Sequence, residues 1–153
     1  MMLSYIKSFF DEKEEIETSI FGTCDGLMSA LGVVIAEGAT ATHHALLVAA
    51  LALAVGSAAS MGAGQWLSDN DKSYKQAFIM GIATLFGSIS PAIPFFFTSG
   101  LIAWILCGII TIIVASIVAE LRPGGRLWSY VVTFGVLIVA SALGVGASFL
   151  GSI

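Results

Sequence analysis

The sequence predicts an all-α integral membrane protein with five transmembrane helices and an N-terminal amphipathic helix on the cytosolic surface. The first reason is composition: 58% of the 153 residues are hydrophobic, only 10% are charged, and the mean hydropathy is +0.98. A soluble domain of this length needs far more charge to cover its surface. The second reason is the length of the apolar stretches, and the third is the placement of the basic residues between them.

The apolar stretches have the length of bilayer spans. A bilayer core of about 30 Å needs roughly 20 apolar residues at about 1.5 Å each. Five stretches of this kind can be cut from the chain: 18–36, 45–67, 77–97, 101–121 and 127–150. They are far longer than barrel strands, and a helix satisfies its own backbone groups in lipid, so all five are predicted to be helices. The third contains Pro91 and Pro94, and only the tripeptide TSG joins it to the fourth, which predicts a tight hairpin.

The predicted organisation has two parts. Residues 1–17 form a cytosolic amphipathic and acidic segment, and residues 18–153 form one five-helix transmembrane domain. In the first part, apolar residues recur at the three- and four-residue spacing of a helix that lies on a membrane surface. They are Met2, Leu3, Ile6, Phe9 and Phe10.

The basic residues predict the orientation. They lie before the first span, between the second and third, or between the fourth and fifth: Lys7, Lys13, Lys72, Lys75, Arg122 and Arg126. With five spans these segments share one face, and the opposite loops contain no lysine or arginine. The positive-inside rule then places the N-terminus in the cytosol and the C-terminus outside it. We expect a prokaryotic plasma membrane, with a vacuolar or other acidic-organelle membrane as the alternative.

Acidic residues precede the first span. Asp11 and Glu14 fit a capping box, and acids stabilise a helix N-terminus. A second interpretation is an entrance that attracts cations, with Glu14 and Glu17 as its acids. The two interpretations are compatible.

Asp25 is the one charged residue of the sequence that lies inside a predicted span rather than in a loop, a tail or a helix end. An ionisable group in a span is costly and by default marks a pathway or a binding site. A structural role, with Asp25 hydrogen-bonded to a neighbouring helix or protonated, is the alternative. On a helix it belongs to a stripe that leads from the cytosol into the membrane and contains Glu14, Thr18, Phe21, Asp25 and Met28.

Small residues predict close helix packing beside Asp25 and in the second span. Gly22 and Gly26 have GxxxG spacing, which lets another helix approach closely. In the second span Gly56, Ser60 and Gly64 repeat every four residues. We expect these two faces to form the seam of a homodimer, with two Asp25 residues near its twofold axis.

A second stripe on the second span carries thioether, amide and hydroxyl groups, on Met61, Gln65, Ser57 and Ser68. An isolated buried methionine is usually only packing. A thioether near an intramembrane carboxylate offers a mixed soft and hard site for Fe²⁺ or Mn²⁺. The candidate metal ligands are therefore Asp25, Met61, Gln65 and Met28.

Three stretches resemble a known family. "CDGLMSALGVVIAEGA" and "AVGSAASMGAGQWLS" resemble the first- and second-helix signatures of the vacuolar iron transporter family, and "GSISPAIPFFF" resembles its third-helix pattern. The resemblance runs from about Phe21 to the C-terminus, and S-M-G-x-G, Ser60 to Gly64, is its most specific part. It implies a homodimer that exports Fe²⁺, and often Mn²⁺, from the cytosol in exchange for protons. The family's pathway aspartate and methionine correspond to Asp25 and Met61, and no tightly bound cofactor is implied.

The chain departs from the family at two places. Gln65 stands where the family has a glutamate, and Trp66 replaces the tyrosine after it. Larger members carry a glutamate-rich metal-binding domain between the second and third helices, where this chain has only "DNDKSYK". Cytosolic metal capture would then rely on the acids of the first helix, on Asp69 and Asp71, or on a separate metal-delivery partner.

Two other function classes stay open. One is a family-like membrane subunit that does not transport and serves assembly or regulation, which Gln65 and the short connection favour. The other is a small-molecule/proton exchanger, in which Asp25 binds an organic cation within an aromatic cavity. We expect no enzyme, because the sequence shows no Ser-His-Asp set, phosphate-cradling loop or zinc motif, and no nucleic-acid partner, because it lacks a basic cluster. His43 and His44 could receive metal or sense pH, or serve as polar interface residues.

Overall fold

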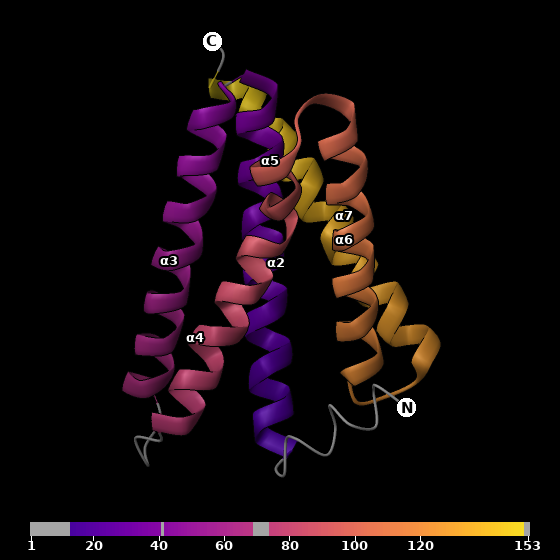
Figure 1. The fold of residues 1–153 in the computed structure, drawn as a ribbon. Helices are drawn as coiled ribbons and strands as arrows, with labels where there is room; N and C mark the ends of the chain where they lie inside the picture. The colour runs from indigo at the N-terminus through magenta and orange to yellow at the C-terminus, as the bar shows by residue number, and fades with distance from the viewer. Residues whose placement is uncertain (1–12, 41, 69–73, 152–153) are drawn as a thin grey trace.

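The computed structural model describes residues 13–40, 42–68 and 74–151, and these residues form helices with no strand among them (Figure 1). The elements are α2 (Lys13–Thr40), α3 (His43–Ser68), α4 (Tyr74–Ile89), η1 (Ser90–Ala92), α5 (Ile93–Phe97), α6 (Gly100–Leu121) and α7 (Arg126–Gly151). The predicted N-terminal amphipathic helix lies outside the described residues.

The predicted spans are confirmed for four helices. α2, α3, α6 and α7 are each long and apolar enough to cross a membrane. The segment 77–97 is not the single long helix that was predicted, because it consists of most of α4, the 3₁₀-helix η1 and the short α5. In Figure 1 these three pieces together run from the lower end of the molecule toward its upper end.

Two prolines explain the break between α4 and α5. Proline has no N–H, and its ring clashes with the carbonyl four residues earlier, so it is tolerated only where a helix begins. Pro91 lies at the start of η1 and Pro94 at the start of α5. The predicted tight connection to α6 is present, because only Thr98 and Ser99 separate the two helices. Gly100, with φ of 66°, adopts the left-handed conformation that this turn requires.

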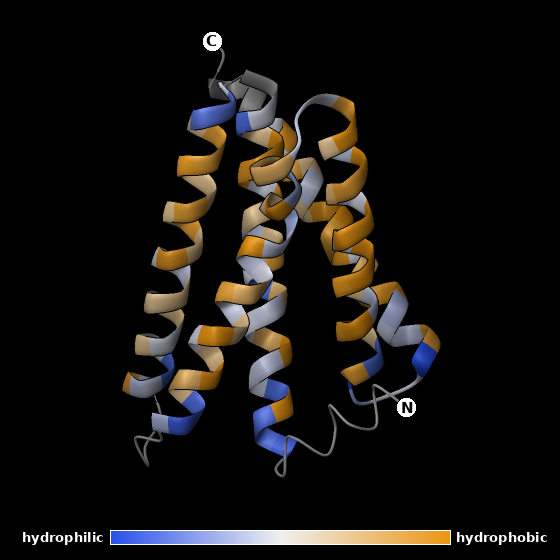
Figure 2. Ribbon diagram, in the orientation of Figure 1, coloured by the Kyte–Doolittle hydropathy of each residue, from blue (hydrophilic) through white to orange (hydrophobic). Residues whose placement is uncertain are grey.

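The outer surface of the bundle is strongly apolar. Leu101 is 75% exposed, Ile138 68% and Leu143 69%. Figure 2 shows hydrophobic residues along most of α3 and α6, and hydrophilic residues mainly at the lower ends of the helices and at the start of α3. Contiguous apolar surface of this kind is covered by lipid or by another protein. The chain is thus a multi-pass membrane protein.

The closest packing in the described residues joins α2 to α4. A Cβ at Gly22 would lie 2.8 Å from the carbonyl oxygen of Met80, and a Cβ at Gly87 would meet the backbone of Thr23. Between these contacts Thr84 is fully buried, and its hydroxyl donates to the Met80 carbonyl at 2.8 Å. The glycines therefore let the two backbones touch, and α4 lies directly against α2.

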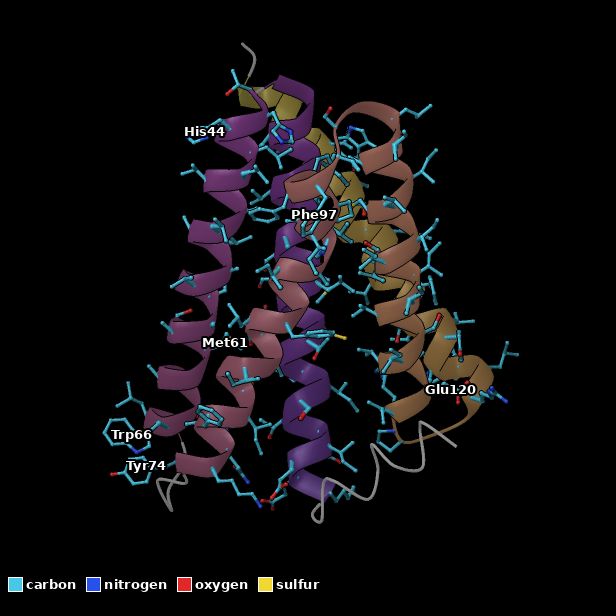
Figure 3. The ribbon with its side chains drawn as sticks, viewed as in Figure 1. His44, Met61, Trp66, Tyr74, Phe97 and Glu120 are labelled. Carbon is cyan, nitrogen blue, oxygen red and sulfur yellow. The ribbon has the colours of Figure 1, made fainter. Side chains whose placement is uncertain are left out.

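The turn between α6 and α7 is held by one carboxylate. Glu120 Oε1 accepts hydrogen bonds from Arg126 Nε at 2.7 Å and from the Tyr130 hydroxyl at 2.9 Å. Figure 3 shows Glu120 at the lower end of the molecule, where α6 ends and α7 begins. The same end contains the start of α2, the end of α3 and the start of α4 (Figure 1).

Candidate functional site

Three polar side chains from three helices meet at the lower end of the molecule. Gln76 of α4 donates to Glu14 Oε2 of α2 at 2.8 Å. Gln65 Nε2 of α3 donates to Gln76 Oε1 at 3.4 Å. Two residues singled out from the sequence, Glu14 and Gln65, are thus joined through Gln76, which the sequence did not indicate. We call Glu14, Gln65 and Gln76 the lower polar cluster.

Ion pairs flank this cluster. Glu15 is only 3% exposed and forms an ion pair with Lys75 of α4. Glu17, the second predicted entrance acid, is exposed and lies 3.5 Å from the Lys13 ammonium one turn earlier. Glu15 was not among the predicted site residues, and its pairing with Lys75 ties the start of α2 to the start of α4. Of the predicted entrance acids, Glu14 therefore lies within the cluster, whereas Glu17 pairs with Lys13 and lines a pocket between α2, α6 and α7.

Asp25 lies on α2 near the middle of the helix. It is twelve residues beyond Lys13, which corresponds to about 18 Å along the axis. Its side chain is partly exposed and makes no hydrogen bond or ion pair with any part of the chain that the structure describes. The alternative structural role, with Asp25 hydrogen-bonded to a neighbouring helix of this chain, therefore has no support in the described residues.

Asp25 and Met61 turn toward the same side of the group formed by α2, α3 and α4. The next residue in each case is a glycine that faces the backbone of α4, Gly26 in α2 and Gly62 in α3. One residue earlier along a helix corresponds to a rotation of about 100° away from that contact. Because α2 and α3 run in opposite directions (Figure 1), these two rotations carry the side chains to the same side.

The glycine contacts with α4 also show how far Asp25 and Met61 lie from the lower end of the molecule. The contact beside Asp25 is at Thr84 of α4, and the contact beside Met61 is at Ala77. These positions are seven residues apart on α4, or about 10 Å at about 1.5 Å per residue. Met61 therefore lies nearer the lower end than Asp25 does, and it is one helical turn above Gln65 on α3. Within one chain the lower polar cluster, Met61 and Asp25 therefore lie at increasing distance from the lower end of the molecule, in that order.

Met28 occupies different surroundings from Asp25. It packs against the buried apolar cluster of the bundle and lines a pocket between α2, α6 and α7. Phe21, on the same stripe of α2, is 58% exposed. Of the described residues, no three His, Cys, Asp or Glu side chains lie close enough together to hold a metal ion.

The small-residue faces have different environments. Gly26 faces α4 of the same chain, since a Cβ there would lie 2.8 Å from the Ser88 backbone nitrogen. The expectation that Gly22 and Gly26 contribute to a seam between subunits is therefore wrong, because α4 already covers that face. On α3, by contrast, a Cβ at Gly56 or Gly64 would meet nothing within 4 Å, and Ser60 is exposed. This α3 face is open in the single chain.

The histidines lie at the opposite end from the lower polar cluster. His43 and His44 are both exposed at the start of α3, and Figure 3 shows His44 at the upper end of the molecule. His43 lines a shallow pocket with Phe95, Phe96 and Phe97. Nothing in the described residues joins either histidine to Asp25 or Met61.

Residues 16–73 match the family model of the VIT family. The match confirms the family resemblance over the first two predicted spans, which contain both Asp25 and Met61. It does not extend over the third-helix pattern or the rest of the chain. No curated protein and no solved structure matches the chain.

Proposed function

We propose that this chain, whose residues 16–73 match the VIT family model, exports a divalent metal, Fe²⁺ or Mn²⁺, from the cytosol in exchange for protons. The observation that carries the proposal is the family match over α2 and α3, because these two helices carry Asp25 and Met61, which face the same side of the group formed by α2, α3 and α4. VIT family members are transporters, which also favours transport over an enzymatic role.

The proposed route begins at the lower polar cluster. The carboxylate of Glu14 and the side-chain oxygens of Gln65 and Gln76 are ligands suited to a hard divalent cation. The thioether of Met61 lies one turn further on and is a softer ligand, which favours Fe²⁺ over Mg²⁺ or Ca²⁺. Asp25, still deeper, would bind the ion with a full charge. A separate metal-delivery partner remains part of the proposal, because the connection between α3 and α4 is short.

The basic residues support the direction. The described ones are Lys13, Lys75, Arg122 and Arg126, which lie at the starts of α2, α4 and α7 and just after the end of α6, and Figure 1 shows these helix ends in the lower part of the molecule. The positive-inside rule makes this end cytosolic, so the upper end, with His43, faces the other compartment. If that compartment is acidic, protons moving into the cytosol through Asp25 would drive the metal out. The membrane proposed is the plasma membrane of a prokaryote, with an acidic organelle as the alternative.

The proposed assembly is a homodimer. The side of the bundle that carries Asp25 and Met61 is not covered by α4, and the adjacent α3 face is open at Gly56, Ser60 and Gly64. A second copy placed there would bring its own Asp25 near the first. At the level of Asp25 a divalent cation would then meet two carboxylates, and at the level of Met61 two thioethers, where one chain provides one of each.

Flux measurements in proteoliposomes test the function. The purified protein should move Fe²⁺ or Mn²⁺ with an opposite movement of protons, detected by a metal-sensitive and a pH-sensitive dye. An organic cation should not be moved. Transport of the organic cation alone would support a small-molecule/proton exchanger, and no transport of any of the three would support a non-transporting subunit.

Removing the thioether should weaken metal binding without disturbing the fold. Met61→Leu keeps the volume and the apolar character of the side chain, so stability should change by less than about 1.5 kcal/mol. We expect Fe²⁺ binding to weaken roughly tenfold, which corresponds to about 1.4 kcal/mol. Calorimetric titration checks this, with Met80→Leu, a buried methionine of α4, as the matched control. Unchanged affinity in Met61→Leu would make the thioether a packing group only.

Filling the open face of α3 should separate the two copies. Gly64→Leu adds a side chain where the single chain has free space, so the fold should be retained while the dimer dissociates. Light scattering in mild detergent should report a dimer for the parent protein and a monomer for the variant. Gly108→Leu, at another open position on α6, should remain a dimer. A monomeric parent protein would contradict the proposed assembly.

A further inference from the structure

A pocket of about 430 Å³ lies between α2, α6 and α7, and neither Asp25 nor Met61 lines it. Its walls are apolar, with Ile20, Leu27, Val118, Val136 and Leu137 among the lining side chains. Cys24 lines it, whereas Asp25, the next residue along α2, does not. It opens to the outside of the bundle, because two of its lining residues, Phe21 and Val136, are 58% and 43% exposed.

One end of this pocket carries a guanidinium group. Arg122 follows the last residue of α6, and its Nη1 donates to Thr133 Oγ1 of α7 at 3.4 Å. That distance is long for a hydrogen bond, and a guanidinium has five N–H groups to donate. Within the described residues Arg122 forms no ion pair, whereas its neighbour Arg126 is paired with Glu120 at 2.6 Å. Arg122 therefore has donors left for an anion at the pocket.

The other charged residue at the pocket, Glu17, does not neutralise the positive charge of Arg122. Glu17 lines the same end, but its carboxylate is 3.5 Å from the Lys13 ammonium. Arg122 directly follows α6, whose end lies in the lower part of the molecule, as do the starts of α2, α4 and α7, which carry the other described basic residues (Figure 1). By the positive-inside rule this is the level of the cytosolic headgroups, where anionic lipids are concentrated.

We propose that the pocket between α2, α6 and α7 binds an anionic phospholipid of the cytosolic leaflet. One acyl chain occupies the apolar pocket, and the phosphate accepts hydrogen bonds from Arg122. The pocket supplies the apolar surface that an acyl chain requires, and the unpaired guanidinium supplies a planar set of donors that fits phosphate oxygens. Because α2 forms one wall, a bound lipid would connect the helix that carries Asp25 to α6 and α7.

Lipid titration followed by native mass spectrometry tests the proposal on the full chain. Phosphatidylglycerol and phosphatidylcholine with the same acyl chains are compared. We expect the anionic lipid to bind the parent protein about five- to tenfold more tightly. Arg122→Gln should abolish this preference, Arg122→Lys should retain part of it, and Arg126→Gln, the matched loss of one charge outside the pocket, should leave it unchanged. Val136→Trp, which fills the pocket opening, should weaken binding of both lipids.

Several results would overturn the proposal. One is a preference for phosphatidylglycerol that survives in Arg122→Gln while that variant remains folded. Another is displacement of the lipid by millimolar inorganic phosphate, which would indicate a phosphate site without an acyl chain. A third is binding that appears only after Phe9→Ser and Phe10→Ser together, which would identify the N-terminal segment of the chain as the occupant. None of these results depends on metal transport, so failure here leaves the proposed function intact.

Discussion

Replacing Gly26 with leucine should prevent the transmembrane bundle from folding. A Cβ at this position would collide with the backbone of Thr84 and would lie 2.8 Å from both the backbone nitrogen and the hydroxyl oxygen of Ser88. Because two of these atoms belong to the α4 backbone, no side-chain rotation can relieve the contact. Leucine places three further carbon atoms beyond this Cβ, so the helices would have to separate widely along their closest contact, and close-packed interiors do not absorb such a shift.

The smaller change to alanine gives a measurable stability. Gly26→Ala introduces only the Cβ, so α4 must move by a few tenths of an ångström or more, and we expect a loss of about 1–3 kcal/mol. Gly135→Ala is the matched control, because a Cβ there meets nothing within 4 Å on α7. Thermal unfolding in detergent, followed by circular dichroism, should show a lower midpoint for Gly26→Ala than for the parent protein. The midpoint of Gly135→Ala should be unchanged. Equal midpoints would mean that α2 and α4 are not in backbone contact.

The same glycines show what the sequence could predict and what it could not. GxxxG spacing correctly indicated that a backbone approaches α2 at Gly22 and Gly26. It does not encode which helix approaches, because any small-residue face is compatible with the spacing. Gly87 of α4 supplies the complementary surface, and it is 61 positions after Gly26 in the chain. The choice between α4 and a second subunit is thus a property of tertiary packing.

The four confirmed spans were predictable because their signal is local. Each consists of a continuous apolar stretch, and bilayer thickness sets its length. The segment with Pro91 and Pro94 carries the same apolar composition, which is why it was also predicted to be one helix. The apolar composition of a stretch gives no information on backbone N–H groups, and these two prolines lack theirs. Both prolines were nevertheless visible in the sequence. A proline pair inside an apolar stretch is therefore the signal that should have divided this span.

The lower polar cluster shows the opposite case. Glu14 and Gln65 were singled out from their positions on helix stripes, but Gln76 was not, because a glutamine directly before a predicted span is unremarkable. Its contact with Glu14 joins residues 62 positions apart. That contact exists only because α4 starts beside the start of α2, so no local pattern could have indicated it.

Replacing Asp25 with asparagine should abolish metal transport while leaving the protein folded. Asparagine keeps the shape of the side chain and can still form hydrogen bonds, but it has neither a charge nor a transferable proton. Asp25 forms no hydrogen bond or ion pair with the described part of the chain, so the substitution removes no interaction that holds the fold. The variant therefore separates a role in transport from a role in structure.

The physical reason is that one carboxylate can hold either a divalent cation or a proton. A carboxylate binds the metal only when it is deprotonated, so metal affinity should fall as the pH is lowered. In a homodimer two such groups would lie near each other, and like charges favour protonation of at least one when no metal is bound. Exchange between proton and metal at this pair would then be the transport cycle. In Asp25→Asn both halves of the exchange are lost.

The measurement is Fe²⁺ or Mn²⁺ flux into liposomes, recorded together with a pH-sensitive dye on the opposite side. Flux in Asp25→Asn should fall to the level of protein-free liposomes, and the accompanying proton movement should disappear. Asp25→Glu is the matched control, because it keeps a carboxylate at the same position and should retain part of the flux. Size-exclusion profiles identical to the parent protein establish that both variants are folded. Proton-linked flux that persists undiminished in Asp25→Asn would show that this carboxylate, alone in the middle of α2, takes no part in transport.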